Sequence, residues 1–139
     1  MNTQRLRDRI KAHEGCVLHA YEDSEGYLTI GYGRLIDPRR GGGISQSEAD
    51  QLLTHDIIDV TAQISARKPV FRTLPEPVQE ALVEMGFQMG VHGLMQFDQM
   101  WAALEAGDFG AAHDAALDSR WAEQTPNRAR DVAERIEDV

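Results

Sequence analysis

Three polar residues near the N-terminus have the types and spacing that acid–base chemistry requires. Glu14, Asp23 and Thr29 lie within the segment HEGCVLHAYEDSEGYLTIGYG, with eight residues between the first two and five between the last two. Two carboxyl groups can serve as proton donor and proton acceptor when their surroundings give them different proton affinities. A nearby hydroxyl group can hold a water molecule. The segment is therefore a candidate site for proton transfer to and from a bound substrate.

The two carboxyl groups are expected to lie in different surroundings. Glu14 ends a helix predicted over residues 3–14, which stops at Gly15, and the negative end of a helix dipole disfavours a charged carboxylate. Asp23 lies in the turn sequence EDSEG, a more solvated setting that keeps a carboxylate ionised. Taken singly, a frayed helix end and an ordinary turn aspartate are the alternatives.

The residues on either side of this turn predict a β-hairpin between Val17 and Leu35. The stretches VLHAY and YLTIGYG are rich in residues that favour strands. Alternation along the second strand puts Thr29 on one face together with Tyr27 and Gly31. The alternative for Thr29 is an ordinary solvated strand face.

The rest of the chain is predicted to be helical. After a flexible connection over residues 36–43, Ser45 and Glu48 form the S-x-x-E capping box that starts a long helix. Its apolar stripe consists of Ala49, Leu52, Leu53, Ile57, Val60 and Ile64. Further helices are predicted over residues 75–89, near 97–106 and 108–117, and after an N-cap at Thr125. Strands and helices are thus segregated along the chain, which indicates the α+β class.

Composition narrows the classes of function. The single cysteine, Cys16, excludes an internal disulfide. With 23 acidic and 14 basic residues the net charge is −9, which disfavours binding to nucleic acid and to anionic membranes. The first 15 residues hold no apolar run long enough for a signal peptide or a membrane span. We therefore expect neither classical export nor stable insertion into a membrane.

The candidate segment closely resembles the phage-type lysozymes, glycoside hydrolase family 24. The resemblance continues through FQMG at residues 87–90 and SRWAEQTPNRARDV at residues 119–132, and it covers nearly the whole chain. It implies a single lysozyme domain over residues 1–139 with two lobes and an active-site cleft between them. The expected parts are a sheet lobe at about 15–45, a connecting helix at about 46–64, and a helical lobe formed by 1–14 and about 65–139.

The family resemblance also implies a reaction. It is hydrolysis, with inversion, of the β-1,4 bond between N-acetylmuramic acid and N-acetylglucosamine in bacterial peptidoglycan. By resemblance Glu14 protonates the glycosidic oxygen, while Asp23 and Thr29 position the attacking water. The family needs no cofactor or metal for this chemistry, and we expect a monomer.

Three further residues receive roles by resemblance. Arg128, in the TPNRA sequence, corresponds to an arginine that reaches the catalytic glutamate in the family. Leu35 and Phe87 match positions that line the sugar-binding cleft, with core packing as their alternative. One departure lies beside the site, where Arg34 follows Gly33 and the family usually has histidine.

The sequence excludes one other class of function and leaves two open. His13, Glu14 and His19 do not form a zinc protease motif, because H-E-x-x-H would need histidine where Val17 stands. A catalytically idle wall-binding or structural module and a bacterial wall-degrading effector stay open. An endolysin would wait in the host cytoplasm and would need a separately made membrane pore, a holin, to reach the periplasm and wall.

Overall fold

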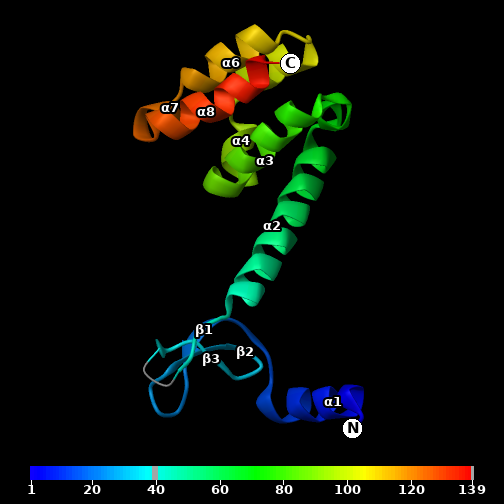
Figure 1. The fold of residues 1–139 in the computed structure, drawn as a ribbon, viewed down its shortest axis with the longest axis vertical. Helices are drawn as coiled ribbons and strands as arrows, with labels where there is room; N and C mark the ends of the chain where they lie inside the picture. Colours follow the sequence, from blue (N-terminus) through cyan, green and yellow to red (C-terminus); the bar gives the residue numbers. More distant parts are fainter. Residues whose placement is uncertain (39–40, 139) are drawn as a thin grey trace. The chain divides into compact units, whose positions relative to one another are not determined.

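The fold is described by a computed structural model covering residues 1–38 and 41–138. The chain divides into two units, Met1–Gln51 and Leu52–Val139 (Figure 1). Two positions of the predicted connection, 39 and 40, lie outside the described residues. The division falls within the helix Gln46–Arg67. The predicted grouping of residues 1–14 with the helical lobe stays a prediction.

The first unit opens with helix α1, Thr3–Glu14, which has the predicted bounds. Its N-terminus is capped by Asn2, whose side-chain oxygen accepts a hydrogen bond of 2.9 Å from the backbone of Arg5. At the other end, Gly15 has φ +68° and donates its backbone N–H to Lys11 at 3.1 Å. A positive φ costs glycine little, so the chain can leave the helix directly after Glu14.

A three-stranded antiparallel sheet follows, and it confirms the predicted hairpin. Strands β1, Val17–Glu22, and β2, Leu28–Gly31, pair across the turn that begins at Asp23. A third strand, β3, Arg34–Leu35, pairs with β2 and was not predicted. Two residues are too few to show a strand's alternating pattern, and only pairing with β2 defines this strand.

Helix α2, Gln46–Arg67, begins at the predicted capping box. The hydroxyl oxygen of Ser45 accepts from the backbone N–H of Glu48 at 3.1 Å, and the Glu48 carboxylate accepts from the backbone of Ser45 at 3.0 Å. The same carboxylate binds Arg34 through two hydrogen bonds of 2.7 and 2.8 Å. Glu48 therefore joins the start of α2 to strand β3.

The second unit is helical. Its elements are a short 3₁₀ helix, Pro69–Thr73, and then α3 Glu76–Met89, α4 Val91–Met95, α5 Asp98–Glu105, α6 Phe109–Leu117, α7 Arg120–Gln124 and α8 Pro126–Glu137. The α+β class is thereby confirmed. Helices α4 and α7 were not predicted, because five residues are too few to show an apolar stripe.

Helical spacing correctly predicted much of the core of the second unit. The predicted apolar residues of α3 and α8 are fully buried, namely Val78, Ala81, Leu82, Met85, Ala129, Val132, Ala133 and Ile136. Of the stripe on α2 only Ile64 is buried, and Val60 packs against the core. The predicted cap at Thr125 is correct in position, but its hydroxyl donates to the Trp121 carbonyl and does not cap α8.

Within residues 1–38 and 41–138, no helix has the length and apolar character needed to span a membrane.

The ion pair at the start of α2 predicts a pH dependence that can be measured. Hydrogen bonds from Arg34, and then from the backbone of Ser45, lower the pKa of Glu48 from 4.5 to about 2. Because the folded pKa is lowered, the stabilisation is present above the unfolded value and is lost as pH falls toward about 2. In a carbon NMR titration, we expect Arg34→Ala to return the Glu48 midpoint toward 4.5.

Ser45→Ala is the matched control, because it removes the hydroxyl group that bonds Glu48 but keeps Arg34 and the Ser45 backbone N–H. We expect it to move the midpoint much less than Arg34→Ala does. An unchanged midpoint in Arg34→Ala would contradict the assigned cause.

Candidate functional site

The carboxyl group of Glu14 lies against the backbone of Gly33. A Cβ atom built on Gly33 would stand 2.6 Å from Glu14 Oε2 and 3.2 Å from its Cδ. Gly33 also has φ +76°, a conformation that other residues rarely adopt. The turn between β2 and β3 therefore meets the end of α1 at a point where only glycine fits without displacement.

Further contacts bring α1 to the same turn. The Lys11 ammonium lies 5.4 Å from the centre of the Tyr32 ring, a cation–π distance. Cys16, just after the helix, raises the pKa of the Tyr32 hydroxyl, first through an electrostatic effect of its sulfur atom and then through a hydrogen bond. Residues on either side of Glu14 are thus held next to the residue that precedes Gly33.

Asp23 is fixed by the turn that it begins. Its Oδ1 atom accepts backbone N–H bonds from Glu25 and Tyr27, both at 2.9 Å, and its own carbonyl accepts from Gly26 at 3.0 Å. Both side-chain bonds go to Oδ1. The turn therefore sets the orientation of the carboxylate and leaves Oδ2 as the oxygen suited to accept a proton.

Thr29 lies in the middle strand and is 4% exposed, so the alternative of a solvated strand face is wrong. Its hydroxyl donates to the carbonyl of Tyr27 at 3.0 Å. Since that bond uses its only proton, the hydroxyl oxygen can serve further partners only as an acceptor. Thr29 pairs with Tyr21 on β1 and with Leu35 on β3, which places these side chains on one face of the sheet.

One residue joins the two predicted water-binding groups. Tyr27 donates its backbone N–H to Asp23 and accepts the hydroxyl proton of Thr29 at its carbonyl. The candidate set Glu14, Asp23 and Thr29 belongs entirely to the first unit, as does the predicted sugar contact Leu35. Sequence reasoning missed Gly33; its only signal was the G-Y-G pattern between the strands.

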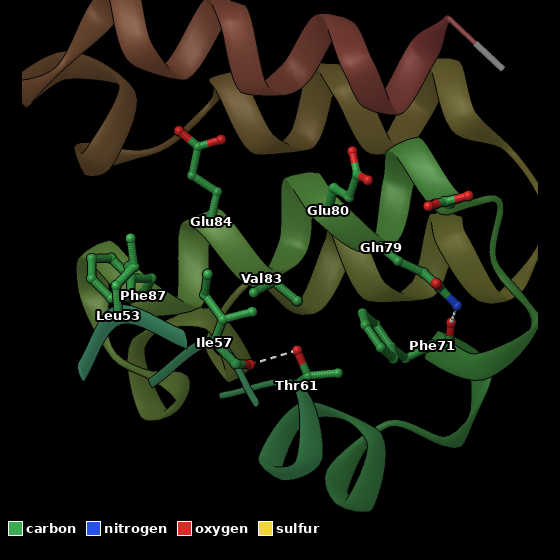
Figure 2. Close-up of a pocket in the computed structure, with 10 residues that line it drawn as sticks. Leu53, Ile57, Thr61, Phe71, Gln79, Glu80, Val83, Glu84 and Phe87 are labelled. Atoms are coloured by element: carbon green, nitrogen blue, oxygen red, sulfur yellow. Dashed lines mark hydrogen bonds between the residues drawn. The ribbon is translucent and has the colours of Figure 1, made fainter. Parts of the chain in front are cut away.

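The second unit holds Phe87, the other predicted sugar contact. Its side chain is 46% exposed, so the alternative of core packing is wrong. Phe87 lines a pocket of about 440 Å³ whose apolar wall includes Leu53, Ile57 and Val83 (Figure 2). Aromatic and aliphatic side chains of this kind can pack against the apolar face of a sugar ring.

Arg128 lies on α8, where its Nε atom is 3.5 Å from an oxygen of Glu84. Glu84 also binds Arg135. Within the second unit, the charge of Arg128 is therefore partly balanced by a carboxylate of α3. The partnership between Arg128 and Glu14 that the family resemblance implies stays a prediction.

No group of three or more histidine, cysteine, aspartate or glutamate side chains among residues 1–38 and 41–138 is arranged to hold a metal ion.

The chain is similar to known proteins over nearly its whole length. The family model described as phage lysozyme matches residues 11–136. Probable T4-type lysozyme 1 of Dictyostelium discoideum is 28% identical over 158 residues, covering 95% of this chain and 93% of that protein. An endolysin of Acyrthosiphon pisum secondary endosymbiont phage 1 is 29% identical over 121 residues, covering 87% of this chain and 80% of the endolysin.

A phage spike protein is also among the relatives. The pre-baseplate central spike protein Gp5 of Enterobacteria phage T4 is 34% identical over 152 residues. The match covers 91% of this chain but only 26% of the spike protein. This chain thus spans about a quarter of the length of that relative.

The contact between Gly33 and Glu14 predicts how two glycine substitutions should differ. Gly33→Ala and Gly26→Ala both place a side chain at positive φ, with φ +76° and +82°, and each should cost about 1–3 kcal/mol of stability. Only the first meets Glu14; nothing lies within 4 Å of a Cβ at Gly26. We expect NMR to show a displaced Glu14 carboxyl group in Gly33→Ala alone, since the flexible side chain can swing aside.

Denaturant unfolding provides the control. If both variants lose similar stability but only Gly33→Ala displaces Glu14, backbone strain alone is not the cause of the displacement. An unmoved Glu14 carboxyl group in folded Gly33→Ala would contradict the close approach.

Proposed function

We propose that this chain, which belongs to the phage lysozyme family, hydrolyses the glycan strands of bacterial peptidoglycan. The bond cleaved is the β-1,4 linkage between N-acetylmuramic acid and N-acetylglucosamine. The observation that carries the proposal is the linkage of Asp23 to Thr29 through the Tyr27 backbone, in the same unit as Glu14. Together these residues supply a proton donor, a proton acceptor and a water-binding hydroxyl oxygen.

Glu14 is the proposed proton donor. Protonating the glycosidic oxygen makes the departing sugar a neutral alcohol while positive charge develops on the ring carbon that is attacked. Gly33 contributes by having no side chain, since a Cβ atom would occupy the position of the Glu14 carboxyl group. Contact with the Gly33 backbone limits the orientations open to the Glu14 side chain, which lowers the cost of reaching the reactive geometry.

Asp23 and Thr29 are the proposed holders of the nucleophilic water. The water would donate one hydrogen to Asp23 and the other to the Thr29 hydroxyl oxygen, whose own proton is already bound to Tyr27. With both hydrogens engaged, an oxygen lone pair of the water is free to attack the sugar. Asp23 then accepts the proton as the new carbon–oxygen bond forms.

Inversion of configuration follows if the water attacks from the face opposite the departing sugar. Enzymes of this kind separate their two carboxyl groups by roughly 6.5–9.5 Å, which leaves room for the water. A direct displacement of this kind needs no covalent intermediate. Proton NMR of the first product formed would identify the anomer, and retention of configuration would exclude the water-mediated route.

The negative charge of the chain is concentrated in the second unit, away from the proposed catalytic residues in the sequence. Residues 1–51 carry seven basic and eight acidic side chains, whereas residues 52–139 carry seven and fifteen, giving net charges of −1 and −8. Peptidoglycan is itself anionic, so strongly negative surfaces are repelled by it. The unit that holds Glu14, Asp23 and Thr29 is nearly neutral, which limits this repulsion at the site of reaction.

The spike relative favours a second setting for the same chemistry. Its similarity supports a role as a wall-digesting part of a delivery particle, alongside the role of an endolysin in host lysis. A catalytically idle wall-binding module is less well supported, because a binder has no chemical need for an acid, a base and a water-binding hydroxyl together.

The assignment of the acid can be tested directly. Glu14→Gln keeps the size of the side chain but cannot donate the proton, so we expect cleavage of purified peptidoglycan to fall on the order of a hundredfold or more. Mass spectrometry should find fragments with reducing N-acetylmuramic acid ends from the wild type. Gln4→Glu is a control on the same helix that leaves the proposed site intact.

Circular dichroism must show that Glu14→Gln is folded. Near-wild-type cleavage by the folded variant would remove Glu14 from its role, and absence of cleavage by the wild type would favour the idle module.

The two settings differ in how the enzyme reaches the wall. As an endolysin released through a holin pore, the chain expressed in a bacterial cytoplasm should lyse cells only when a holin is co-expressed. Culture turbidity with and without the holin measures this, and Glu14→Gln serves as the inactive control. Lysis by the chain in the absence of any pore would contradict dependence on a holin.

A further inference from the structure

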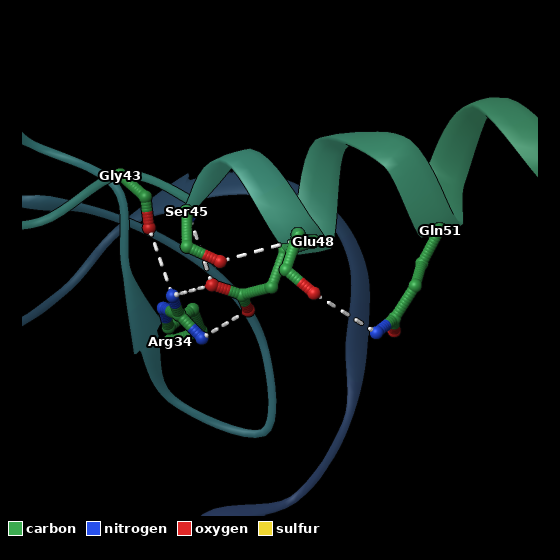
Figure 3. Close-up of polar contacts among 6 residues, drawn as sticks. Arg34, Gly43, Ser45, Glu48 and Gln51 are labelled. Atoms are coloured by element: carbon green, nitrogen blue, oxygen red, sulfur yellow. Dashed lines mark hydrogen bonds and ion pairs between the residues drawn. The ribbon is translucent and has the colours of Figure 1, made fainter.

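Arg34 forms a bidentate contact at the back of the candidate site. Its two terminal nitrogens donate to the two carboxylate oxygens of Glu48 at 2.8 and 2.7 Å, and one of them also donates to the carbonyl of Gly43 at 3.1 Å (Figure 3). Paired bonds of this type fix the orientation of both side chains, as single charge contacts do not. Glu48 is itself held by Ser45 at the start of α2.

The position of Arg34 in the sequence gives this contact its importance. Arg34 stands between Gly33, whose backbone meets Glu14, and Leu35, which pairs with Thr29. Side chains of adjacent strand residues point to opposite faces. The Arg34 side chain is therefore directed away from the face that carries Leu35 and Thr29, and it can anchor the strand from behind.

The strand itself provides little rigidity. β3 has two residues and lies at the edge of the sheet, where short strands are weakly held. Beyond the strand, the backbone of Ile36 donates to Leu28 at 2.9 Å and that of Gly43 donates to Leu35 at 3.1 Å. The ion pair adds a connection between this edge and the first turn of a helix 22 residues long.

We propose that Arg34 and Glu48 form a positioning pair that holds residues 33–35 in place. The pair thereby sets the position of the Gly33 backbone against the Glu14 carboxyl group and the position of Leu35, the proposed sugar contact. This inference rests on the proposed hydrolysis of peptidoglycan. Arg34 touches neither the substrate nor the reacting atoms; it acts through Gly33 and Leu35. The pair persists at neutral pH, since Arg34 keeps the pKa of Glu48 near 2.

A positioning role differs from a contribution to overall stability. The side chains of Arg34 and Glu48 are 50% and 38% exposed, and exposed pairs contribute little to the free energy of unfolding. Misplacement of a reacting group by about 1 Å, by contrast, can slow a reaction by about a hundredfold. Loss of the pair should therefore lower kcat strongly while the unfolding temperature changes little.

The test compares Arg34→Ala, Glu48→Gln and the double variant on soluble peptidoglycan fragments at a temperature well below unfolding. We expect each single variant to lower kcat by about tenfold and to raise KM by a smaller factor through the displaced Leu35, and the double variant to be no slower than either. Arg34→Lys retains the charge but loses the paired bonds, so it should recover little of kcat. Additive effects in the double variant, or kcat at the wild-type value in Arg34→Ala, would overturn the inference.

Ser45→Ala is the matched control, because it weakens the cap of α2 and leaves Arg34 and Glu48 in contact. It should lower the unfolding temperature while kcat stays at the wild-type value. A loss of kcat in Ser45→Ala equal to that in Arg34→Ala would assign the effect to the helix cap and overturn the positioning role.

Amide hydrogen exchange tests the positioning role without turnover. The amides of Ile36 and Gly43 should exchange faster in Arg34→Ala and Glu48→Gln than in Ser45→Ala, because their bonds hold the same edge of the sheet. If the wild type cleaves no peptidoglycan, the proposed function fails and exchange alone decides the structural inference. Unchanged exchange in Arg34→Ala would overturn it.

Discussion

The candidate site of the first unit is built around the close approach of the Gly33 backbone to the carboxyl group of Glu14. The space that a side chain at residue 33 would fill holds a carboxyl oxygen of Glu14, and φ +76° independently disfavours most other residues. Gly15 also has a positive φ, +68°, and this conformation lets the chain turn from the end of α1 into β1. Two glycines at positive φ therefore allow a helix end and a strand turn to meet around one carboxylate.

Around that contact, backbone groups do most of the orienting. Tyr27 supplies an N–H to Asp23 and a carbonyl to Thr29, so two side chains expected to share a water take their orientation from one peptide segment. The arrangement makes the hydroxyl of Thr29 an acceptor for further partners, because its proton is already used. Side chains fixed by backbone bonds lose less conformational freedom when a substrate binds.

The two units are stabilised in different ways. All the buried apolar side chains of the described residues belong to the second unit, from Ile64 to Ile136, while the buried residues of the first are Thr29 and Asp37. The second unit thus rests on packing around α3 and α8. The first rests on strand pairing and turns, and bonds of this kind open locally more easily than a packed core.

The sequence by itself determined the features that depend on neighbouring residues. The bounds of α1, the capping box of Ser45 and Glu48, the hairpin around Asp23 and the buried face of α8 all follow from short-range rules of capping, turn formation and periodicity. The tertiary structure decided what joins distant segments. It paired β3 with β2, and it brought Gly33 to Glu14 and Arg34 to Glu48. It also decided that the Thr125 hydroxyl donates to the Trp121 carbonyl and does not cap α8. A two-residue strand and a glycine have no side-chain pattern to read, and their roles arise only when folding brings separate parts of the chain into contact.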